Sequence, residues 1–298
     1  MSFELLDWSI VGPALAAGLL VLATHVPLGQ EVLKRGIIFI DLAIAQIAGL
    51  GVVAAHGFGW DPTGFEVQAA AVSAALVAAA VLNWTEKRWP ATQEALIGIS
   101  FILAATGGIL LLANNPHGSE HLKDLLVGQI LWSTWGSLAP VALLYAVLLL
   151  VWFLWREKIG RFGFYVTFAI AVTASVQIVG VYLVFASLII PALATSRWQR
   201  GRRLAASYTI GAVSYLAGIV LSAVFDLPTG AVVVWTLAAV SLAAGFATAH
   251  RNRPATGTAT DPATAPGTLA GNPAGLATTT PESGSQEHDP RSAQRVGH

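Results

Sequence analysis

Long apolar runs separated by short polar breaks occupy most of the chain up to residue 250. A helix needs about 20 mostly apolar residues to cross the hydrocarbon core of a bilayer. Seven runs approach that length and are predicted as membrane-spanning helices: residues 10–26, 36–56, 67–82, 95–113, 138–155, 204–224 and 230–249. The pattern therefore predicts an all-α polytopic membrane protein.

A further apolar run, residues 162–196, is too long for one span when each helical residue advances about 1.5 Å. Basic residues flank both of its ends, so the chain must return to the side from which it started. Gly180 lies near the middle, where a residue without a Cβ atom allows the backbone to turn at low cost. We expect two spans joined by a tight corner at Gly180, which gives about nine transmembrane helices in total.

Lys and Arg are concentrated in every second loop. The basic groups are Lys34/Arg35, Lys87/Arg88, Arg156/Lys158/Arg161, Arg197/Arg200/Arg202/Arg203 and Arg251/Arg253. The N-terminus and the loops between these groups are acidic or nearly neutral. Because loops that stay in the cytoplasm keep an excess of Lys and Arg, the alternation predicts an external N-terminus and a cytoplasmic C-terminus.

The composition agrees with a protein whose solvent is the lipid bilayer, since 55% of the residues are apolar and 11% are charged. The formal net charge is zero, but it says nothing about nucleic acid because the charges are segregated by side. No nucleic acid partner is expected. The chain has no cysteine, which excludes disulfides and thiolate metal sites. Three regions are predicted: an extracytoplasmic N-terminus (residues 1–9), a transmembrane domain (residues 10–250) and a disordered cytoplasmic tail rich in Pro, Ala, Thr and Gly (residues 251–298).

Few polar side chains lie inside the predicted spans. Asp41 is a carboxylate in an otherwise apolar span, which is costly unless it faces a partner or a wet cavity. It either has a functional role, or it pairs with Lys34 or Arg35 or reaches the membrane interface. Gln177 either lines a polar route or makes an interhelical hydrogen bond. His25, alone near a predicted span end, is expected at the interface.

The segment after the fourth predicted span carries a cluster of metal-ligating residue types. Its members are spaced at intervals of three, one and three residues: His117, Glu120, His121 and Asp124. If the segment is helical, this spacing places all four on one face. Two imidazoles and two carboxylates suit zinc, manganese or ferrous iron. The alternative is the polar face of an interfacial amphipathic helix, with Leu122, Leu125 and Leu126 on its buried side.

A proline near the predicted cytoplasmic face precedes a dense group of arginines. Pro191 removes a helix hydrogen bond and bends the chain. Four arginines follow within a dozen residues: Arg197, Arg200, Arg202 and Arg203. The segment is predicted to form a short amphipathic element, which is either an ordinary basic cytoplasmic loop or a docking surface.

Three segments together resemble the membrane subunits of ATP-binding-cassette importers for zinc, manganese and iron. They are RGIIFIDLAIAQIAGLG (residues 35–51), the pair ALIGISFILAATGGILLLA and HGSEHLKDLLVGQILW, and GVYLVFASLIIPALATSRW (residues 180–198). The resemblance extends from about residue 27 to residue 245, and the order and spacing of the segments carry it. It implies a type II importer-like permease bundle.

The resemblance also implies roles for particular residues. Residues 192–203, which follow Pro191, are expected to form a coupling helix that inserts into a groove on an ATPase subunit. Relatives carry an Asp and a His four residues apart in the second span. Here the best match to the His is Gln46, five residues after Asp41. Gln is a weak ligand compared with imidazole, so the resemblance implies a polar lining formed by Asp41, Gln46 and Gln177 in place of a tight nitrogen-ligated site.

The partners implied by the resemblance are a second copy of the chain, a cytoplasmic ATP-binding subunit and an extracytoplasmic metal-binding protein, all at the inner membrane of a bacterium. The chain has no G-x-x-x-x-G-K-[ST] phosphate loop, so ATP hydrolysis is assigned to the partner. The metal is the transported substrate, and no cofactor is expected. The alternatives are a transporter coupled to protons through Asp41 and an intramembrane enzyme. Against them, no internal repeat and no H-E-x-x-H or G-x-S-x-G motif is evident.

Overall fold

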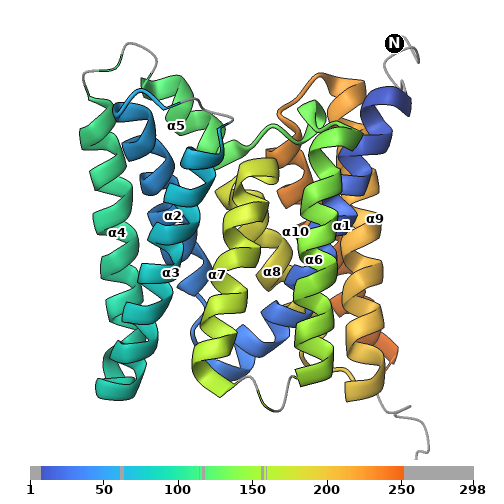
Figure 1. The fold of residues 1–298 in the computed structure, drawn as a ribbon. Coiled ribbons are helices and arrows are strands. Elements are labelled where there is room, and N and C mark those ends of the chain that lie inside the picture. Colours follow the sequence, from blue (N-terminus) through green and yellow to red (C-terminus); the bar gives the residue numbers. More distant parts are fainter. Residues whose placement is uncertain are drawn as a thin grey trace, which may run out of the picture. The chain divides into compact units, whose positions relative to one another are not determined.

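The structure is a computed structural model that describes residues 8–251, except for residues 61–63, 114, 116–117, 156–157 and 159. These residues belong to the first of two units, Met1–Arg253, and the predicted tail lies almost entirely outside the described residues. The described α-helices are α1 (Trp8–Arg35), α2 (Ile40–Gly57), α3 (Phe65–Arg88), α4 (Gln93–Leu112), α5 (Gly118–Val127), α6 (Trp135–Trp155), α7 (Gly160–Val179), α8 (Val181–Ala194), α9 (Arg200–Phe225) and α10 (Thr229–Arg251) (Figure 1). Two short 3-10 helices, η2 (Pro90–Thr92) and η3 (Ile130–Trp132), lie at corners.

The helices confirm the all-α polytopic architecture. Within the described ranges, eight helices are long and apolar enough to cross a membrane. Together with α8, which is apolar but has only 14 residues, they account for the nine spans expected from the sequence. The additional helix, α5, lies between α4 and α6 and is short and more polar.

The first helix is longer than its apolar run indicated. It was expected to end near residue 26, but α1 continues through Pro27 to Arg35. A proline costs one backbone hydrogen bond, and here the helix is held on both sides of it by buried residues such as Val26 and Val32. The last turn carries Lys34 and Arg35, where positive charge is favoured by the helix dipole.

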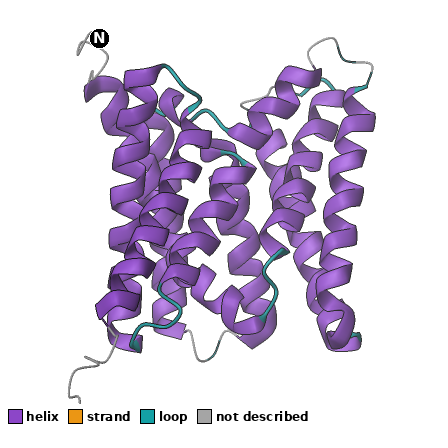
Figure 2. Cartoon of the chain, turned by 180° about the vertical axis from the view of Figure 1, so that it is seen from behind, coloured by secondary structure: helices purple, strands orange, loops and turns teal. Residues whose placement is uncertain are grey.

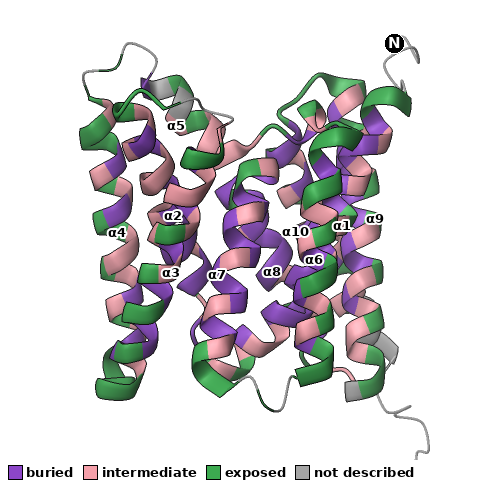
Figure 3. Ribbon diagram, in the orientation of Figure 1, coloured by how far each residue is buried: buried purple, intermediate pink, exposed green. Residues whose placement is uncertain are grey.

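The helices pack as two groups with α7 between them (Figure 1). In one group α2 packs against both α3 and α4, and in the other α1 and α10 pack against both α8 and α9. The view from behind shows the same division (Figure 2). Phe164, Tyr165 and Phe168 of α7 are fully buried, and buried residues gather on α7 and α8, whereas α4 is largely exposed (Figure 3).

The ends of the helices separate the charges by side. Lys34 and Arg35 end α1, Lys87 and Arg88 end α3, and Arg161 lies at the start of α7. These helix ends lie on the lower side in Figure 1. The alternation of charge along the sequence therefore corresponds to two faces of the helical bundle.

The face opposite the basic ends contains a corner built on glycines. Gly180 has a φ of 78° and caps the start of α8, which confirms the tight corner expected there. Gly128, with a φ of 73°, follows α5, and its backbone lies directly against Val179 and Gly180. A Cβ atom on Gly128 would overlap the carbonyl group of Val179. Only glycine allows both this backbone conformation and this close approach.

We predict that Gly128→Ala lowers the stability of the purified protein. The substitution adds the strain of a positive φ to a steric overlap, which together cost about 2–4 kcal/mol. The matched control is Gly98→Ala in α4, since nothing lies within 4 Å of a Cβ atom at Gly98. The measurement is the apparent unfolding temperature in detergent. An unfolding temperature for Gly128→Ala equal to that of the control would contradict the proposed close contact.

Candidate translocation route and coupling surface

Asp41 lies in the first turn of α2, directly after the turn that joins α1 to α2. Gly36, with a φ of 72°, ends α1, and α2 begins at Ile40. The side chain of Asp41 is fully buried, and neither of its carboxylate oxygens has a hydrogen-bond partner among the described residues. The partial positive charge at the start of α2 favours a carboxylate there. A buried carboxylate without a bonded partner is nevertheless costly, which is typical of a functional position.

The ion pair that was considered for Asp41 is not formed with either neighbouring cation. Arg35 pairs with Glu31 through a hydrogen bond of 3.0 Å from Nε to Oε1, and its guanidinium lies 4.2 Å from the centre of the Phe164 ring. Lys34 lies 3.9 Å from the same carboxylate of Glu31. Both cations that could have neutralised Asp41 are therefore held by Glu31.

Gln46 does not share a helix face with Asp41. Each residue of an α-helix turns by about 100°, so a spacing of five places the two side chains about 140° apart. The position one turn after Asp41 belongs to Ala45, which is fully buried, whereas Gln46 is only half-buried. The position four residues after Asp41 is thus occupied on this face by a methyl group.

Gln177 lies near the C-terminal end of α7 and is exposed on this chain. Asp41 starts α2 at the basic side, so the two residues lie at different depths of the bundle. Gln177 makes no hydrogen bond to another helix within the described part of the chain, and the interhelical role considered for it is not seen. A route that passes Asp41, Gln46 and Gln177 stays a prediction.

The cluster of candidate metal ligands falls on and just before α5. The helix includes Glu120, His121 and Asp124, as the spacing predicted. His117 and the side chain of His121 lie outside the described residues, so the structure leaves the four-ligand site untested. Glu120 is exposed and Asp124 is half-buried. In the described ranges no three His, Asp or Glu side chains lie close enough together to hold a metal ion.

The leucines of α5 lie on its buried side, as expected for an amphipathic helix. Leu122, Leu125 and Leu126 are all half-buried. The Cδ1 atom of Leu125 lies 3.9 Å from the position that a Cβ atom on Gly49 of α2 would occupy. One face of α5 therefore packs on the bundle, while Glu120 is exposed. This arrangement is compatible with either interpretation of the polar face.

The expectation of a separate helix over residues 192–203 is wrong. Helix α8 continues through Pro191 to Ala194, residues 195–199 form a turn, and α9 begins at Arg200. We call residues 195–203 the coupling turn. The arginines of this segment were assigned to one amphipathic element, but three of them, Arg200, Arg202 and Arg203, lie in the first turn of α9, which extends for 26 residues.

A network of buried hydroxyl groups fixes the coupling turn. The hydroxyl of Thr195 donates to the carbonyl oxygen of Pro191 at 2.9 Å. The Ser207 hydroxyl lies 2.7 Å from the Thr195 hydroxyl and 3.2 Å from the same carbonyl oxygen. Gln30 of α1 donates to Ser207 at 3.5 Å. The network therefore ties the end of α8 to α9 and to α1.

The coupling turn presents positive charge outwards. Arg197 and Arg202 are exposed, and in the described part of the chain no carboxylate pairs with either of them. Arg203 is half-buried, and its Nε atom has no hydrogen-bond partner among the described atoms. The side chain of Arg200 lies outside the described residues. A rigid turn with unpaired guanidinium groups can bind an acidic groove on another protein.

His25 does not lie at the end of its helix. It was expected at the interface, but α1 continues ten residues beyond it, and its side chain is fully buried. Its Nδ1 atom lies 2.9 Å from the carbonyl oxygen of Val21 and 3.0 Å from the Thr24 hydroxyl. Its Nε2 atom has no hydrogen-bond partner within the described residues. The missed signal was the continuation of the helix through Pro27.

A bundle of membrane-spanning helices with an unpaired buried carboxylate and an exposed basic turn is typical of polytopic membrane transport proteins. The model of one transport family, described as the ABC 3 transport family, matches residues 7–164 and 156–248. These ranges include almost all of the described helices. The chain therefore belongs to the ABC 3 transport family, which confirms the resemblance that the three sequence segments indicated.

Two bacterial proteins illustrate this relationship. The chain is 29% identical over 254 residues to the manganese transport system membrane protein MntC of Halalkalibacterium halodurans, covering 78% of this chain and 85% of MntC. It is 23% identical over 249 residues to the high-affinity zinc uptake system membrane protein ZnuB of Haemophilus influenzae, covering 76% of this chain and 93% of ZnuB.

A solved structure has the same fold. A chain of the PsaBC complex of Streptococcus pneumoniae, solved with a Fab, aligns with a TM-score of 0.67 at 21% sequence identity. The alignment covers 82% of this chain and 95% of that chain.

We predict that Ser207→Ala destabilises the protein, because the substitution removes the hydrogen bonds that the buried Ser207 hydroxyl makes with Thr195, with the Pro191 carbonyl oxygen and with Gln30. The expected cost is about 1–3 kcal/mol. Ser196→Ala is the matched control, since Ser196 is an exposed serine of the same turn. The measurement is the apparent unfolding temperature in detergent. Equal unfolding temperatures for the two variants would show that the hydroxyl network contributes nothing.

Proposed function

We propose that this chain is the membrane-spanning subunit of an ATP-driven importer for a divalent metal ion. The observation that carries the proposal is the match to the ABC 3 transport family across the helical bundle. The chain itself performs no covalent chemistry. ATP hydrolysis belongs to a separate cytoplasmic subunit, an extracytoplasmic metal-binding protein delivers the ion, and two copies of the chain enclose the route.

The cargo that we propose is manganese, zinc or ferrous iron. The names of MntC and ZnuB specify manganese and zinc, and both proteins align with most of this chain. Asp41 supplies a carboxylate that divalent cations bind, and its buried, unbonded oxygens are available for a ligand. Ala45 occupies the adjacent turn, so no imidazole assists Asp41 from that position. Oxygen ligands without imidazole suit manganese better than zinc.

The coupling that we propose uses α8 as a lever between the coupling turn and the start of α2. Phe185 of α8 stacks on Phe39, which immediately precedes α2, with ring centres 6.5 Å apart and planes within 8°. Asp41 lies two residues after Phe39. When ATP binding draws the two ATPase subunits together, a movement of the coupling turn is transmitted through α8 to the helix that carries Asp41. Nucleotide thereby shifts the population between inward-open and outward-open states.

The proposed location is the inner membrane of a bacterium. The basic ends of the helices support placing the coupling turn in the cytoplasm, which puts the N-terminus outside and the tail inside. The protein requires no cofactor of its own, because the metal is its substrate. Nucleic acid has no role in this proposal.

We predict that Asp41→Asn lowers metal uptake roughly tenfold, because a neutral amide binds a divalent cation less strongly than a carboxylate does. Uptake of radioactive manganese and zinc is measured in cells that express the chain with its ATPase partner. Glu66→Gln, which changes an exposed acid at the start of α3, is the control and retains uptake. Unchanged uptake by Asp41→Asn would exclude Asp41 from the route.

The same assay separates ATP-driven import from proton-coupled transport. An ATP-driven importer loses uptake when the ATPase partner carries a mutation in its phosphate loop, and it retains uptake when a protonophore is added while ATP is maintained. A proton-coupled transporter responds in the opposite way to both treatments. The second pattern would overturn the proposed function.

We predict that the double variant Arg197→Glu and Arg202→Glu uncouples transport from ATP hydrolysis. Repulsion from an acidic groove weakens the docking of the ATPase without disturbing the buried network beneath the turn. The readouts are co-purification of the ATPase and ATP-dependent uptake, and both should fall. Arg161→Glu is the control, because Arg161 is an exposed arginine on the same side of the bundle but outside the coupling turn. Normal co-purification of the double variant would contradict the docking role.

A further inference from the structure

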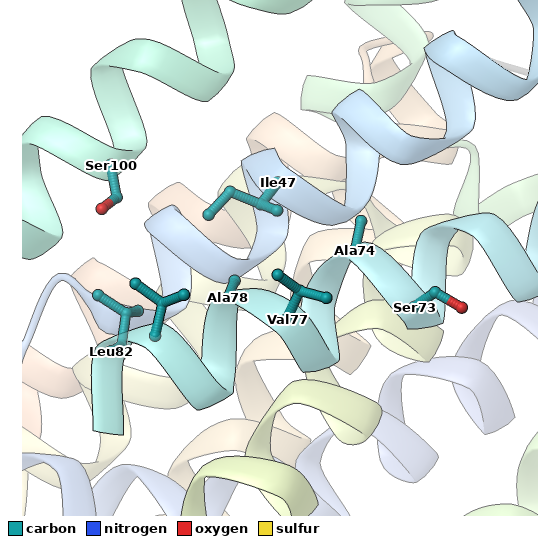
Figure 4. Close-up of a pocket in the computed structure, with 8 residues that line it drawn as sticks. Ile47, Ser73, Ala74, Val77, Ala78, Leu82 and Ser100 are labelled. Carbon is teal, nitrogen blue, oxygen red and sulfur yellow. The ribbon is translucent and has the colours of Figure 1, made fainter. Parts of the chain in front are cut away.

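A groove lies between α3 and α4. Both helices pack against α2, but they make few contacts with each other. The space between them is a cavity of about 450 Å³ (Figure 4). Val77, Val81 and Leu82 of α3 line it, together with Ile47 of α2 and Ser100 of α4.

The lining of the groove suits an apolar occupant. The hydroxyl of Ser100 already donates to the carbonyl oxygen of Leu96 at 2.8 Å, so it does not require a partner in the groove. Val77 and Val81 remain 64% and 49% exposed on this chain. At this depth of a bilayer the surrounding solvent is hydrocarbon. A hydrocarbon chain would cover these side chains and recover the dispersion contacts that an empty groove lacks.

The groove leads along α3 to a basic and aromatic site at the end of the helix. Val77, Val81, Trp84 and Arg88 follow one another at helical spacing, so they lie on one face of α3. Trp84 packs edge-on against Trp89 with ring centres 5.2 Å apart, and the guanidinium of Arg88 lies 5.8 Å from the centre of the Trp89 ring.

The cations at this site are available to an anion. Across the described ranges no carboxylate forms an ion pair with Lys87 or Arg88, and both side chains are exposed. Tryptophan rings settle at the level of lipid head groups, and basic side chains beside them attract anionic lipids. The apolar groove therefore matches the acyl chain of a phospholipid, and the cationic end of α3 matches its anionic head group.

We propose that the groove between α3 and α4 binds an acyl chain of an anionic phospholipid, whose head group contacts Lys87 and Arg88 in the leaflet on the basic side of the bundle. This lipid is a structural ligand that fills the gap in the group formed by α2, α3 and α4. The inference goes beyond the proposed transport function and is independent of which ion is carried.

The test uses native mass spectrometry of the purified full-length chain after reconstitution in vesicles of mixed phosphatidylglycerol and phosphatidylcholine. The chain is expected to retain phosphatidylglycerol in preference to phosphatidylcholine after release into detergent. Lys87→Gln combined with Arg88→Gln should weaken this retention roughly thirtyfold, because each of the two cations contributes to binding of the head group. Arg161→Gln removes an exposed cation elsewhere on the same side and should retain the lipid.

A second variant tests the groove itself. Val77→Trp fills the space with an indole ring and should displace the lipid while leaving the head-group site intact. The control is Leu103→Trp, which places the same ring on an exposed position of α4 outside the groove. The proposal would be overturned if Val77→Trp retained the lipid, or if the chain retained both phospholipids equally. It would also be overturned if the controls Arg161→Gln and Leu103→Trp lost the lipid as much as the test variants do.

The remaining possible occupant is a second copy of the chain. Because the chain has no native cysteine, Val77→Cys introduces a unique thiol into the groove. In the proposed state this thiol reacts with a maleimide-bearing lipid in the vesicle and does not cross-link two copies of the chain. Efficient cross-linking between copies at this position would show that protein covers the groove, and it would refute lipid binding there.

Discussion

The absence of water from the bilayer core is the constraint on which the rest of this structure depends. Most hydroxyl groups inside the bundle therefore donate a hydrogen bond to a carbonyl oxygen of their own helix. Thr173 donates to Ala169 and Ser214 donates to Ile210, both at 2.7 Å. Others join neighbouring helices, as the hydroxyls of Tyr215 and Ser187 do at 2.8 Å. Against this background, Asp41 is a buried carboxylate with neither oxygen bonded among the described residues, which supports the role that we propose for it.

Helix α8 is short and is held at both ends. Its 14 residues extend about 21 Å, which is less than the hydrocarbon thickness of about 30 Å. At one end its backbone meets that of Gly128, and at the other the hydroxyls of Thr195 and Ser207 hold the Pro191 carbonyl. A short helix held at both ends suits the lever that we propose. Its Phe185 stacks on Phe39, beside the start of α2.

The sequence predicted the parts of the fold that depend on local chemistry. Hydropathy located the spans, the basic loops located one face, and Gly180 marked the corner, because each of these follows from a single residue type or run. It failed where tertiary packing decides the outcome. Helix α1 passes through Pro27 because buried neighbours hold it, and Glu31 takes both cations that could have paired with Asp41. The hydroxyl network beneath the coupling turn joins residues that are distant in sequence.

The groove between α3 and α4 is a consequence of the same solvent. An alanine-rich helix such as α3 approaches α2 closely, since a Cβ atom on Gly51 would lie 2.9 Å from the carbonyl oxygen of Ala70. The small side chains that allow this close approach do not reach α4, which itself packs against α2. In water such a gap would be destabilising. In a bilayer the surrounding lipid supplies the missing volume, so the composition of the membrane becomes part of how this group of helices is packed.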